Sequence, residues 1–265
     1  MNFIRHILLA IQFFTRIPVT GRLAAWVGYS PELLRASAAH FPGIGWLVGA
    51  VAAFGYAVLG LLLPDSTFTP LLAAVLSTVL TVLLTGGLHE DGLSDVADGL
   101  GGGHTRERAL EIMKDSRVGA FGVLALVLAL LAKVALLALL GDIDWGLACA
   151  SLFGAHVVSR FFPLGLIRLL PYVSEAARAK SASLAGQIDT ASLVVAALWL
   201  AAALVLLQVA YPDIVWVTGL FGAFLAWLLM WAWLARRLQG YTGDCLGATQ
   251  QVCELAFYLG LAISL

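Results

Sequence analysis

Long apolar runs joined by short polar connections make up most of the chain. A helix needs about 20 apolar residues to cross the hydrocarbon of a bilayer, and runs of that length recur. They lie at roughly 42–63, 70–88, 119–140, 145–169, 190–210, 213–236 and 247–265. The pattern predicts an all-α, polytopic integral membrane protein with about seven transmembrane helices. The glycines of the first run, among them Gly45 and Gly49, predict a helix that is bent or packed closely against a neighbour.

The residues before the first run have a two-sided pattern. On a helix, Arg5, Gln12 and Arg16 fall along one line, whereas apolar side chains such as Phe3 and Ile7 lie elsewhere. This pattern predicts an N-terminal amphipathic helix that lies in the membrane interface rather than across the bilayer.

The composition supports the membrane assignment. Hydrophobic residues make up 61% of the chain and charged residues only 12%, whereas an ordinary soluble domain has about 25% charged residues. The net charge of −1 gives no reason to expect nucleic acid as a partner. Cys149, Cys245 and Cys253 form no C-x-x-C pair, which argues against a disulfide framework and a zinc site. Since no internal repeat or low-complexity linker is visible, residues 1–265 are predicted to form a single membrane domain.

Lys and Arg residues are concentrated on one side of a seven-span arrangement. That side holds Arg5, Arg16, Arg22, Arg35, Arg106, Arg108, Lys114, Arg117, Arg168, Arg178, Lys180, Arg236 and Arg237. The connections on the other side contain neither residue type, and the remaining two, Lys133 and Arg160, lie inside spans. By the positive-inside rule, the N-terminus and segment 86–119 are predicted to be cytoplasmic.

Segment 86–119 is dense in charge and glycine, and it is the predicted catalytic segment. Asp91, Asp95 and Asp98 are spaced i, i+4, i+7, so on a helix they share one face within an arc of roughly 60°. Carboxylates placed so closely repel one another unless a cation lies among them. With the neighbouring Glu90 they offer the hard oxygen ligands that Mg²⁺ takes together with water and substrate phosphate. The sequence therefore predicts a divalent-metal and diphosphate site at the membrane surface.

Residues around the aspartates are predicted to bind the substrate. Arg106, Lys114 and Arg117 supply cations for phosphate oxygens that the metal leaves free. Gly92 and Gly99 each lower helix stability by about 1 kcal/mol relative to alanine. Close approach of a bulky ligand to the backbone would explain why glycine stands there.

The simpler interpretation is a solvated acidic face, but such a face does not require its acids in one stripe beside glycines at the end of a membrane span. His89 and Asp91 do not begin a zinc-protease motif, because the position of the second histidine is Leu93. Residues 101–103 lack the G-K-[ST] of a Walker loop. His89 and His104 are therefore interpreted as hydrogen-bonding loop residues rather than metal ligands.

A second polar island, 239–254, leads into the last apolar run. Asp244 is expected to cap that helix or to act as a ligand. Glu254 lies inside the apolar helix, where a carboxylate marks a functional site by default. Arg160 lies deep in another span; pairing with Asp244 or Glu254 would explain it, and both Arg160 and Asp244 are counted as substrate-binding residues. Lys133 is expected to snorkel toward the interface.

Several motifs follow one another along the chain in a recognisable order. They are FFTRIPV at 13–19, FPGIGWLVG at 41–49, GGLHEDGLSDVADGLGGG at 86–103, RERALEIMKDSRVGAFGVLAL at 106–126, SRFFPL at 159–164, PYVSEAARAKS at 171–181 and GYTGDCLGA at 240–248. Together they resemble the cobalamin synthase family, the bacterial adenosylcobinamide-GDP ribazoletransferases, and the acidic motif is the most specific of them. The chain departs from that pattern at Ser94, where the family often has alanine, and at Gln239, where it often has glycine.

The resemblance implies an enzyme that joins α-ribazole, or its 5′-phosphate, to adenosylcobinamide-GDP and releases GMP, with adenosylcobalamin or its phosphate as the product. It also implies a need for Mg²⁺ and a place in the bacterial cytoplasmic (inner) membrane, with the lipid bilayer as partner and the active site on the cytoplasmic face. Asp91 and Asp95 are then expected to hold the metal. Asp98 is expected to be a further ligand or the general base that accepts the hydroxyl proton. Whether copies of the chain form a homo-oligomer is left open.

Two alternatives remain at the level of sequence. A CDP-alcohol phosphotransferase also holds metal and diphosphate with helical aspartates, but it would carry D-G-x-x-A-R, and here Asp98 follows Ala97. A small-molecule transporter would place paired ionisable groups near the middle of the bilayer. Only Lys133, Arg160 and Glu254 are available for that role.

Overall fold

The computed structural model describes residues 2–173 and 188–265, and it confirms an all-α fold. Arg178, Lys180 and most of the 171–181 motif lie outside the described residues. The helices are α1 (Asn2–Phe14), α2 (Gly21–Val27), α3 (Pro31–Ser37), α4 (Phe41–Leu62), α5 (Thr69–Thr85), α6 (Leu88–Gly102), α7 (Arg106–Ile112), α8 (Ala120–Ile143), α9 (Trp145–Phe161), α10 (Pro163–Leu169), α11 (Thr190–Ala210), α12 (Trp216–Arg237) and α13 (Gly243–Ser264). A short 3₁₀ turn joins α3 to α4.

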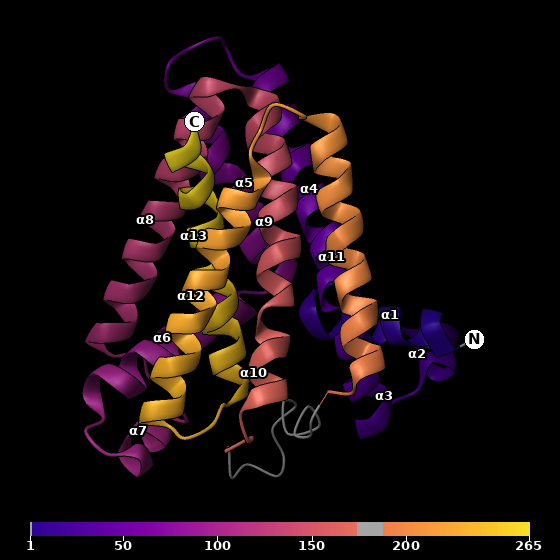
Figure 1. Ribbon diagram of the computed structural model, residues 1–265, viewed down its shortest axis with the longest axis vertical. Coiled ribbons are helices and arrows are strands. Elements are labelled where there is room, and N and C mark those ends of the chain that lie inside the picture. Colours follow the sequence, from indigo (N-terminus) through magenta and orange to yellow (C-terminus); the bar gives the residue numbers. More distant parts are fainter. Residues whose placement is uncertain (1, 174–187) are drawn as a thin grey trace.

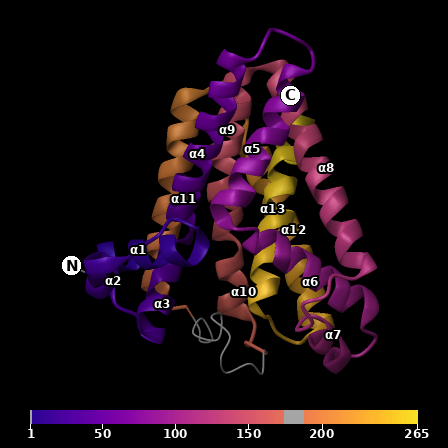
Figure 2. The same ribbon diagram turned by 180° about the vertical axis from the view of Figure 1, so that it is seen from behind.

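The long helices stand side by side along the long axis of the molecule. Following the chain, α4, α5, α8, α9, α11, α12 and α13 run alternately in the two directions of this axis (Figure 1). One end of the bundle holds α6, α7 and α10, and most of the described Lys and Arg residues gather there. We call it the basic end. Helices α1, α2 and α3 pack together at the side of the bundle nearer this end, as the view from behind also shows (Figure 2).

The number of helices able to cross a membrane is smaller than the sequence predicts. In the described part of the chain, five helices are long and apolar enough by length and composition, or six if the bent pair α5 and α6 is one span. The five are Pro31–Leu62, Ala120–Ile143, Trp145–Leu169, Thr190–Ala210 and Trp216–Arg237. The last apolar run of the sequence, α13, extends along the bundle like its neighbours (Figure 1) but is too polar to qualify. Its polar side chains are tolerated because more than half of its residues are buried among other helices rather than facing lipid.

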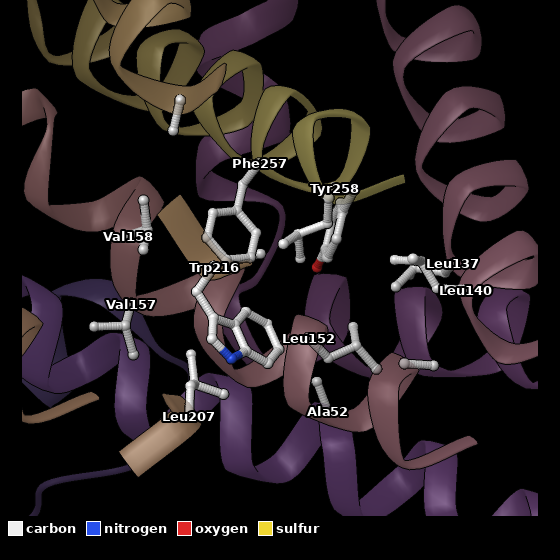
Figure 3. Close-up of a cluster of buried hydrophobic side chains, with 14 of the residues drawn as sticks. Ala52, Leu137, Leu140, Leu152, Val157, Val158, Leu207, Trp216, Phe257 and Tyr258 are labelled. Atoms are coloured by element: carbon white, nitrogen blue, oxygen red, sulfur yellow. The ribbon is translucent and has the colours of Figure 1, made fainter. Parts of the chain in front are cut away.

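Apolar packing fills the half of the bundle away from the basic end. Side chains from α4, α8, α9, α11, α12 and α13 meet there around Trp216, Phe257 and Tyr258 (Figure 3). The contact between α4 and α9 is especially close, because Gly45 and Gly49 present bare backbone to α9. A Cβ at Gly45 would collide with the backbone of α9, and one at Gly49 would lie 2.9 Å from the Cα of Phe153. The prediction of close packing for the first apolar run is therefore confirmed.

A glycine pair redirects the chain between α5 and α6. Gly86 and Gly87 have left-handed φ angles of 69° and 70°, a conformation that costs other residues free energy but not glycine. As a result α6 leaves α5 at an angle of 90°. It lies across the basic end, outside the five spanning helices, and packs there against α7, α8 and α13.

One non-glycine residue in the described part of the chain has a left-handed backbone. Gln239, between α12 and α13, has a φ of 54°, which an L-residue with a side chain adopts at a cost of about 1–2 kcal/mol. The backbone here explains why glycine is common at this position in the family that the sequence resembles.

Candidate active site

A cavity of about 600 Å³ opens at the basic end between α1, the bend from α5 to α6, the junction of α9 with α10, and the start of α13. Its walls include Gln12, Phe14, Arg16, Phe41, His89, Asp91, Arg160, Pro163, Asp244, Gly247 and Gln250. These residues come from the motifs at 13–19, 41–49, 86–103, 159–164 and 240–248, apart from Gln12 and Gln250. Motifs that are far apart in the sequence therefore line one cavity.

Three carboxylates gather where α6 crosses α13, and we call Asp91, Asp95 and Asp244 the acid cluster. Asp91 is exposed and Asp244 mostly buried at the cavity wall, while Asp95 is half-buried. Burial raises the pKa of Asp95 to about 7, and the negative charges of Asp91, Asp244 and Asp98 add to this rise. No ion pair among the described residues involves any member of the acid cluster. The cluster is thus a group of like charges without a balancing cation.

Gly92 brings the two halves of the acid cluster together. A Cβ at this position would lie 2.7 Å from the carbonyl oxygen of Asp244 and 3.1 Å from its Cα. A side chain at position 92 would therefore push the start of α13 away from α6. The expectation that Gly92 admits a ligand to the backbone is corrected, because the protein's own chain occupies that space. The same holds for Gly99, which packs against Met113 and Ala109.

The acid cluster fits a Mg²⁺ ion by charge and by donor type. Carboxylate oxygens are the hard ligands that Mg²⁺ prefers, and the ion usually takes one or two of them while water and substrate phosphates complete its shell. Within the described residues, no group of three His, Cys, Asp or Glu side chains is already arranged as a metal cage.

Asp98 faces the start of α8 rather than the cavity. Its side chain accepts hydrogen bonds from the backbone N–H of Gly119 at 2.6 Å and of Gly122 at 2.8 Å. Gly119 is the N-cap of α8 and has no side chain to cap the helix, so Asp98 supplies the cap from another helix. Asp98 borders a second cavity, of about 390 Å³, with Arg108, Asp115 and Arg117. The three aspartates therefore lie along one face of α6, but Asp98 contacts the start of α8, whereas Asp91 lies at the wall of the large cavity.

Glu90, predicted as a metal ligand, points to the interior of the bundle. Its Oε1 accepts a hydrogen bond from Gln251 of α13 at 3.1 Å. Its Oε2 is buried and has no partner among the described residues. The structure thus separates Glu90 from the acid cluster, although it adjoins Asp91 in the sequence.

The basic residues downstream of the aspartates do not line the large cavity. Arg106 donates through Nε to the carbonyl oxygen of Leu238 at 2.7 Å, so it ties α7 to the end of α12. Arg117 forms an exposed ion pair with Asp115 at 2.6 Å. Lys114 lies exposed just after α7. Of the three predicted phosphate-binding residues, only Arg117 borders a cavity, and that is the second one.

His89 and His104 differ in their surroundings. His89 lies within α6, is buried, and stacks on Phe14 with 6.0 Å between ring centroids. His104 is exposed. Neither belongs to a group that could hold a metal among the described residues. Cys149, Cys245 and Cys253 form no disulfide among the described residues.

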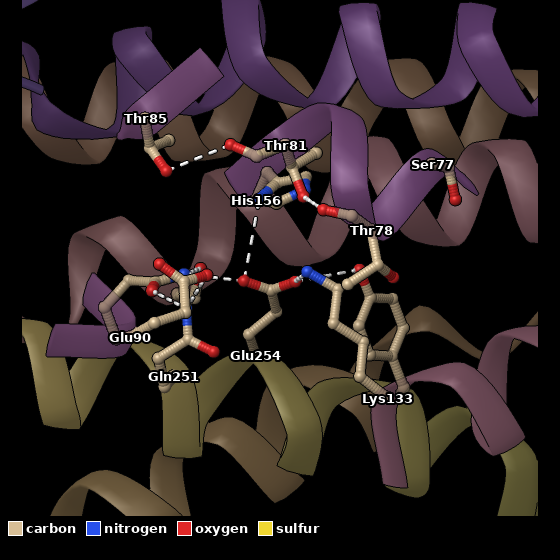
Figure 4. Close-up of polar contacts among 12 residues, drawn as sticks. Ser77, Thr78, Thr81, Thr85, Glu90, Lys133, His156, Gln251 and Glu254 are labelled. Carbon is tan, nitrogen blue, oxygen red and sulfur yellow. Dashed lines mark hydrogen bonds and ion pairs between the residues drawn. The ribbon is translucent and has the colours of Figure 1, made fainter. Parts of the chain in front are cut away.

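A second group of polar and charged residues is buried inside the bundle, and we call Lys133, His156, Arg160, Gln250 and Glu254 the buried network. Figure 4 shows Lys133, His156 and Glu254 of this network. Nζ of Lys133 lies 2.6 Å from Oε1 of Glu254, and Nε2 of Gln250 donates to Oε2 of Glu254 at 2.7 Å. Lys133 therefore pairs with Glu254, and the expectation that it snorkels is wrong. The expectation that Arg160 pairs with Asp244 or Glu254 is also wrong, because Arg160 instead donates to His156.

The sequence analysis missed the contribution of α1 to the cavity. Gln12 and Arg16 line it, and Arg16 packs directly over Gly86 at the bend. The signal was present, since Arg16 belongs to the motif at 13–19. Periodicity predicts an interfacial helix for these residues. It does not show that Arg16, at the end of that helix, lies beside the distant bend at Gly86.

The cavity combines carboxylates on α6 and α13 with one cation from the residues just after α1 and another on α9. A ligand there would meet Asp91 and Asp244 on some walls and Arg16 and Arg160 on others. Such a mixture suits a polyanion whose charge is balanced partly by a divalent metal and partly by arginine.

Comparison with known proteins gives the same family as the motifs. Residues 6–262 match the family described as cobalamin-5-phosphate synthase. The chain is 60% identical to a protein of Polaromonas naphthalenivorans named adenosylcobinamide-GDP ribazoletransferase, over the full length of both. A protein of the same name from Leptothrix cholodnii is 46% identical over 97% of this chain and 94% of the relative, and one from Vibrio cholerae is 42% identical over 95% and 91%. No solved structure matches this chain.

Proposed function

The chain belongs to the cobalamin-5-phosphate synthase family, and from this premise we propose that it is a Mg²⁺-dependent adenosylcobinamide-GDP ribazoletransferase. Its substrates are adenosylcobinamide-GDP and α-ribazole or the 5′-phosphate of α-ribazole. It works at the cytoplasmic face of the bacterial inner membrane. The acid cluster carries the proposal, because uncompensated carboxylates at a cavity lined by five family motifs call for a cation.

The reaction is a substitution at phosphorus. A ribose hydroxyl of α-ribazole bonds to the phosphorus next to cobinamide, the bond from that phosphorus to the bridging oxygen breaks, and GMP leaves. Mg²⁺, when bound, neutralises the diphosphate oxygens as charge moves to the leaving group. Asp91 of α6 would hold the metal together with one of Asp95 and Asp244, which leaves the other of these two carboxylates free.

The hydroxyl proton needs an acceptor within hydrogen-bond reach. Asp98 is poorly suited, because it already accepts N–H groups from α8 and is turned away from the large cavity. This favours Asp95 or Asp244 as the acceptor over the sequence-based assignment to Asp98. Asp98 then acts on the reaction by fixing α6 against α8.

The cytoplasmic placement is supported by the distribution of charge. The acid cluster lies at the basic end, and Lys and Arg are enriched on the cytoplasmic side of membrane proteins. Nucleotide substrates are made on that side, so the proposed site meets them without transport across the bilayer.

The direct test is the assay with purified protein in lipid nanodiscs, adenosylcobinamide-GDP, α-ribazole and Mg²⁺. We expect equal amounts of GMP and a cobalamin product, no turnover in EDTA, and recovery when Mg²⁺ is added back. Asp91→Asn and Asp95→Asn should each lower GMP release at least about 100-fold, the loss typical of removing one electrostatic contact to a transition state. The matched control is Asp65→Asn, an exposed aspartate in the connection at the opposite end, which should keep full activity.

Two outcomes would count against the proposal. Folded wild-type protein that gives no cobalamin product would remove the activity. Turnover that is indifferent to EDTA, or to both asparagine variants, would remove the metal site. A transporter is not favoured by the structure, since the intramembrane Lys133 and Glu254 neutralise each other.

A further inference from the structure

Arg160 is a buried guanidinium that reaches the large cavity from inside the bundle. It lies on α9, is 4% exposed, and belongs to the cavity wall. Its Nη1 lies 3.0 Å from both Nδ1 and the carbonyl oxygen of His156. Its Nε is buried and has no hydrogen-bond partner among the described residues. The guanidinium has five N–H donors, but among the described residues it forms hydrogen bonds through Nη1 alone.

The carboxylates of Glu254 and Glu90 lie near enough for their charges to act on Arg160, but the hydrogen bonds that they accept come from other side chains. Glu254 accepts from Lys133, Gln250 and Tyr258. Glu90 accepts from Gln251. No carboxylate in the described part of the chain lies within ion-pair distance of Arg160.

Burying a guanidinium in this state is unfavourable. A buried charge carries a desolvation penalty of several kcal/mol, which a fully hydrogen-bonded counter-ion offsets. For Arg160, the charges of Glu254 and Glu90 offset part of this penalty from a distance, but no carboxylate of the described residues forms an ion pair with it. The cavity is the remaining direction from which an anion can reach the free donors.

We propose that Arg160 binds the diphosphate of adenosylcobinamide-GDP from the inner wall of the cavity, an assignment that rests on the proposed function. The planar guanidinium fork matches two phosphate oxygens, which a lysine ammonium does not. A metal held at Asp91 and Asp244 would bind some of the diphosphate oxygens. Arg160 binds diphosphate oxygens that the metal would leave free. His156, held within the buried network, fixes the orientation of the fork.

A purely structural arginine would have a different hydrogen-bond pattern. Arg106 shows that pattern, since it donates to the carbonyl oxygen of Leu238 and joins two helices. Arg160 makes both of its bonds to His156, on the same turn of the same helix. It therefore joins no two helices by hydrogen bonds, and its free donors are the feature that needs a ligand.

The first test is chemical protection of the wild-type protein, with GDP as the probe and EDTA present so that no metal contributes. Phenylglyoxal modification of each arginine is followed by peptide mass spectrometry. We expect Arg160 to react through the cavity and saturating GDP to slow that reaction at least about fivefold. Arg117, whose side chain is 87% exposed, is the internal control and should react at the same rate with or without GDP. Equal rates for Arg160 with and without GDP, or no reaction at all, would overturn the proposal.

The second test compares kinetics of Arg160→Lys with those of Arg168→Lys, an exposed arginine on α10 that serves as the control. For Arg160→Lys we expect KM for adenosylcobinamide-GDP to rise about tenfold, the size of one lost charged hydrogen bond. KM for α-ribazole should stay unchanged. Unchanged values for both substrates, or equal rises for both, would contradict a diphosphate role.

The two proposals fail in different ways. If wild-type protein forms no GMP, the proposed function is lost whatever happens at Arg160. If it forms GMP but GDP does not protect Arg160, only the assignment of Arg160 is lost. Should Arg160→Lys fail to fold, the protection experiment on the wild-type protein still decides.

Discussion

Carboxylates occur at two sites of this protein, and the two sites differ in whether a cation of the protein neutralises them. The acid cluster of Asp91, Asp95 and Asp244 has no balancing cation in the described part of the chain, and it borders a cavity. Glu254 of the buried network is closed off from solvent and is neutralised by Lys133 at 2.6 Å.

The two sites differ in what can neutralise their charge. A charge that neither water nor a ligand can reach needs a partner, because an unpaired ion inside the bundle carries a desolvation penalty of several kcal/mol. A group of like charges persists only where a ligand or water can neutralise it. Under the proposed function, a cation from outside neutralises the acid cluster, whereas Lys133 of α8 and Glu254 of α13 already neutralise each other and join two helices of the bundle.

The largest expected effect comes from making the same carboxylate-to-amide change in both groups. Glu254→Gln leaves Lys133 buried and unpaired, which should lower the free energy of unfolding by about 3–5 kcal/mol. Asp95→Asn removes like-charge repulsion and should leave the thermal midpoint unchanged or raise it. Thermal unfolding in detergent measures both.

A double variant sharpens this comparison. Lys133→Met combined with Glu254→Gln removes both charges, so it should recover most of the stability that either single change loses. If Glu254→Gln alone is as stable as the wild type, the pairing with Lys133 is not what holds the bundle.

The next effect concerns Asp98, which the sequence places in the acid stripe and the structure places at the cap of α8. Asp98→Asn weakens a charged acceptor for two backbone N–H groups, and we expect a loss of about 1.5–3 kcal/mol in stability. GMP release should fall much less than in Asp95→Asn. A variant with unchanged thermal midpoint and abolished turnover would instead return Asp98 to the catalytic role.

The pH dependence of stability is expected to be smaller and to depend on Asp95. Its pKa in the folded protein is raised from 3.8 to about 7, so between those values the folded state binds more protons than the unfolded state. Stability is therefore highest below pH 4 with respect to this group and falls as the pH rises through 7. In EDTA, the titration of Asp95 should lower the thermal midpoint of the protein between pH 5 and pH 8. In Asp95→Asn the slope of thermal midpoint against pH should be smaller. An identical slope in the variant would show that other groups cause it.

The smallest effect is expected at Arg117. Its ion pair with Asp115 is exposed, and such pairs contribute about 0–1 kcal/mol. Arg117→Ala should therefore lower the free energy of unfolding by no more than about 1 kcal/mol, so the thermal midpoint should change little. KM for adenosylcobinamide-GDP should change less than about threefold, because Arg117 does not reach the large cavity. A tenfold rise in KM would restore the phosphate-binding role that the sequence suggests.

Much of this arrangement follows from the sequence for identifiable reasons. Helical spacing placed Asp91 and Asp95 together, since a 3.6-residue repeat is a local property. The same spacing included Asp98 but did not reveal the cap at Gly119, because what faces a helix depends on which other helix packs there. Asp244 lies far along the sequence, in the polar island that leads into the last apolar run, and helical spacing does not show that it meets Asp91 and Asp95.

Burial inside the bundle explains the remaining errors. Lys133 was assigned by its distance along a span, yet its neutralising partner lies on α13, which no periodicity connects to α8. The count of seven spans assumed that each apolar run faces lipid. The helix α13 lies among its neighbours and tolerates polar residues, while the glycine pair at 86 and 87 ends α5 early.

The right-angle bend at Gly86 and Gly87 also sets the direction along which the carboxylates of α6 are arranged. With 15 residues and a rise of 1.5 Å per residue, α6 extends roughly 22 Å in the plane of the membrane instead of along its depth. Its carboxylates are therefore laid out sideways at one level. Under the proposed function, a large amphiphilic substrate can reach these carboxylates by moving laterally along the membrane surface, and its charged linkage does not have to enter the hydrocarbon.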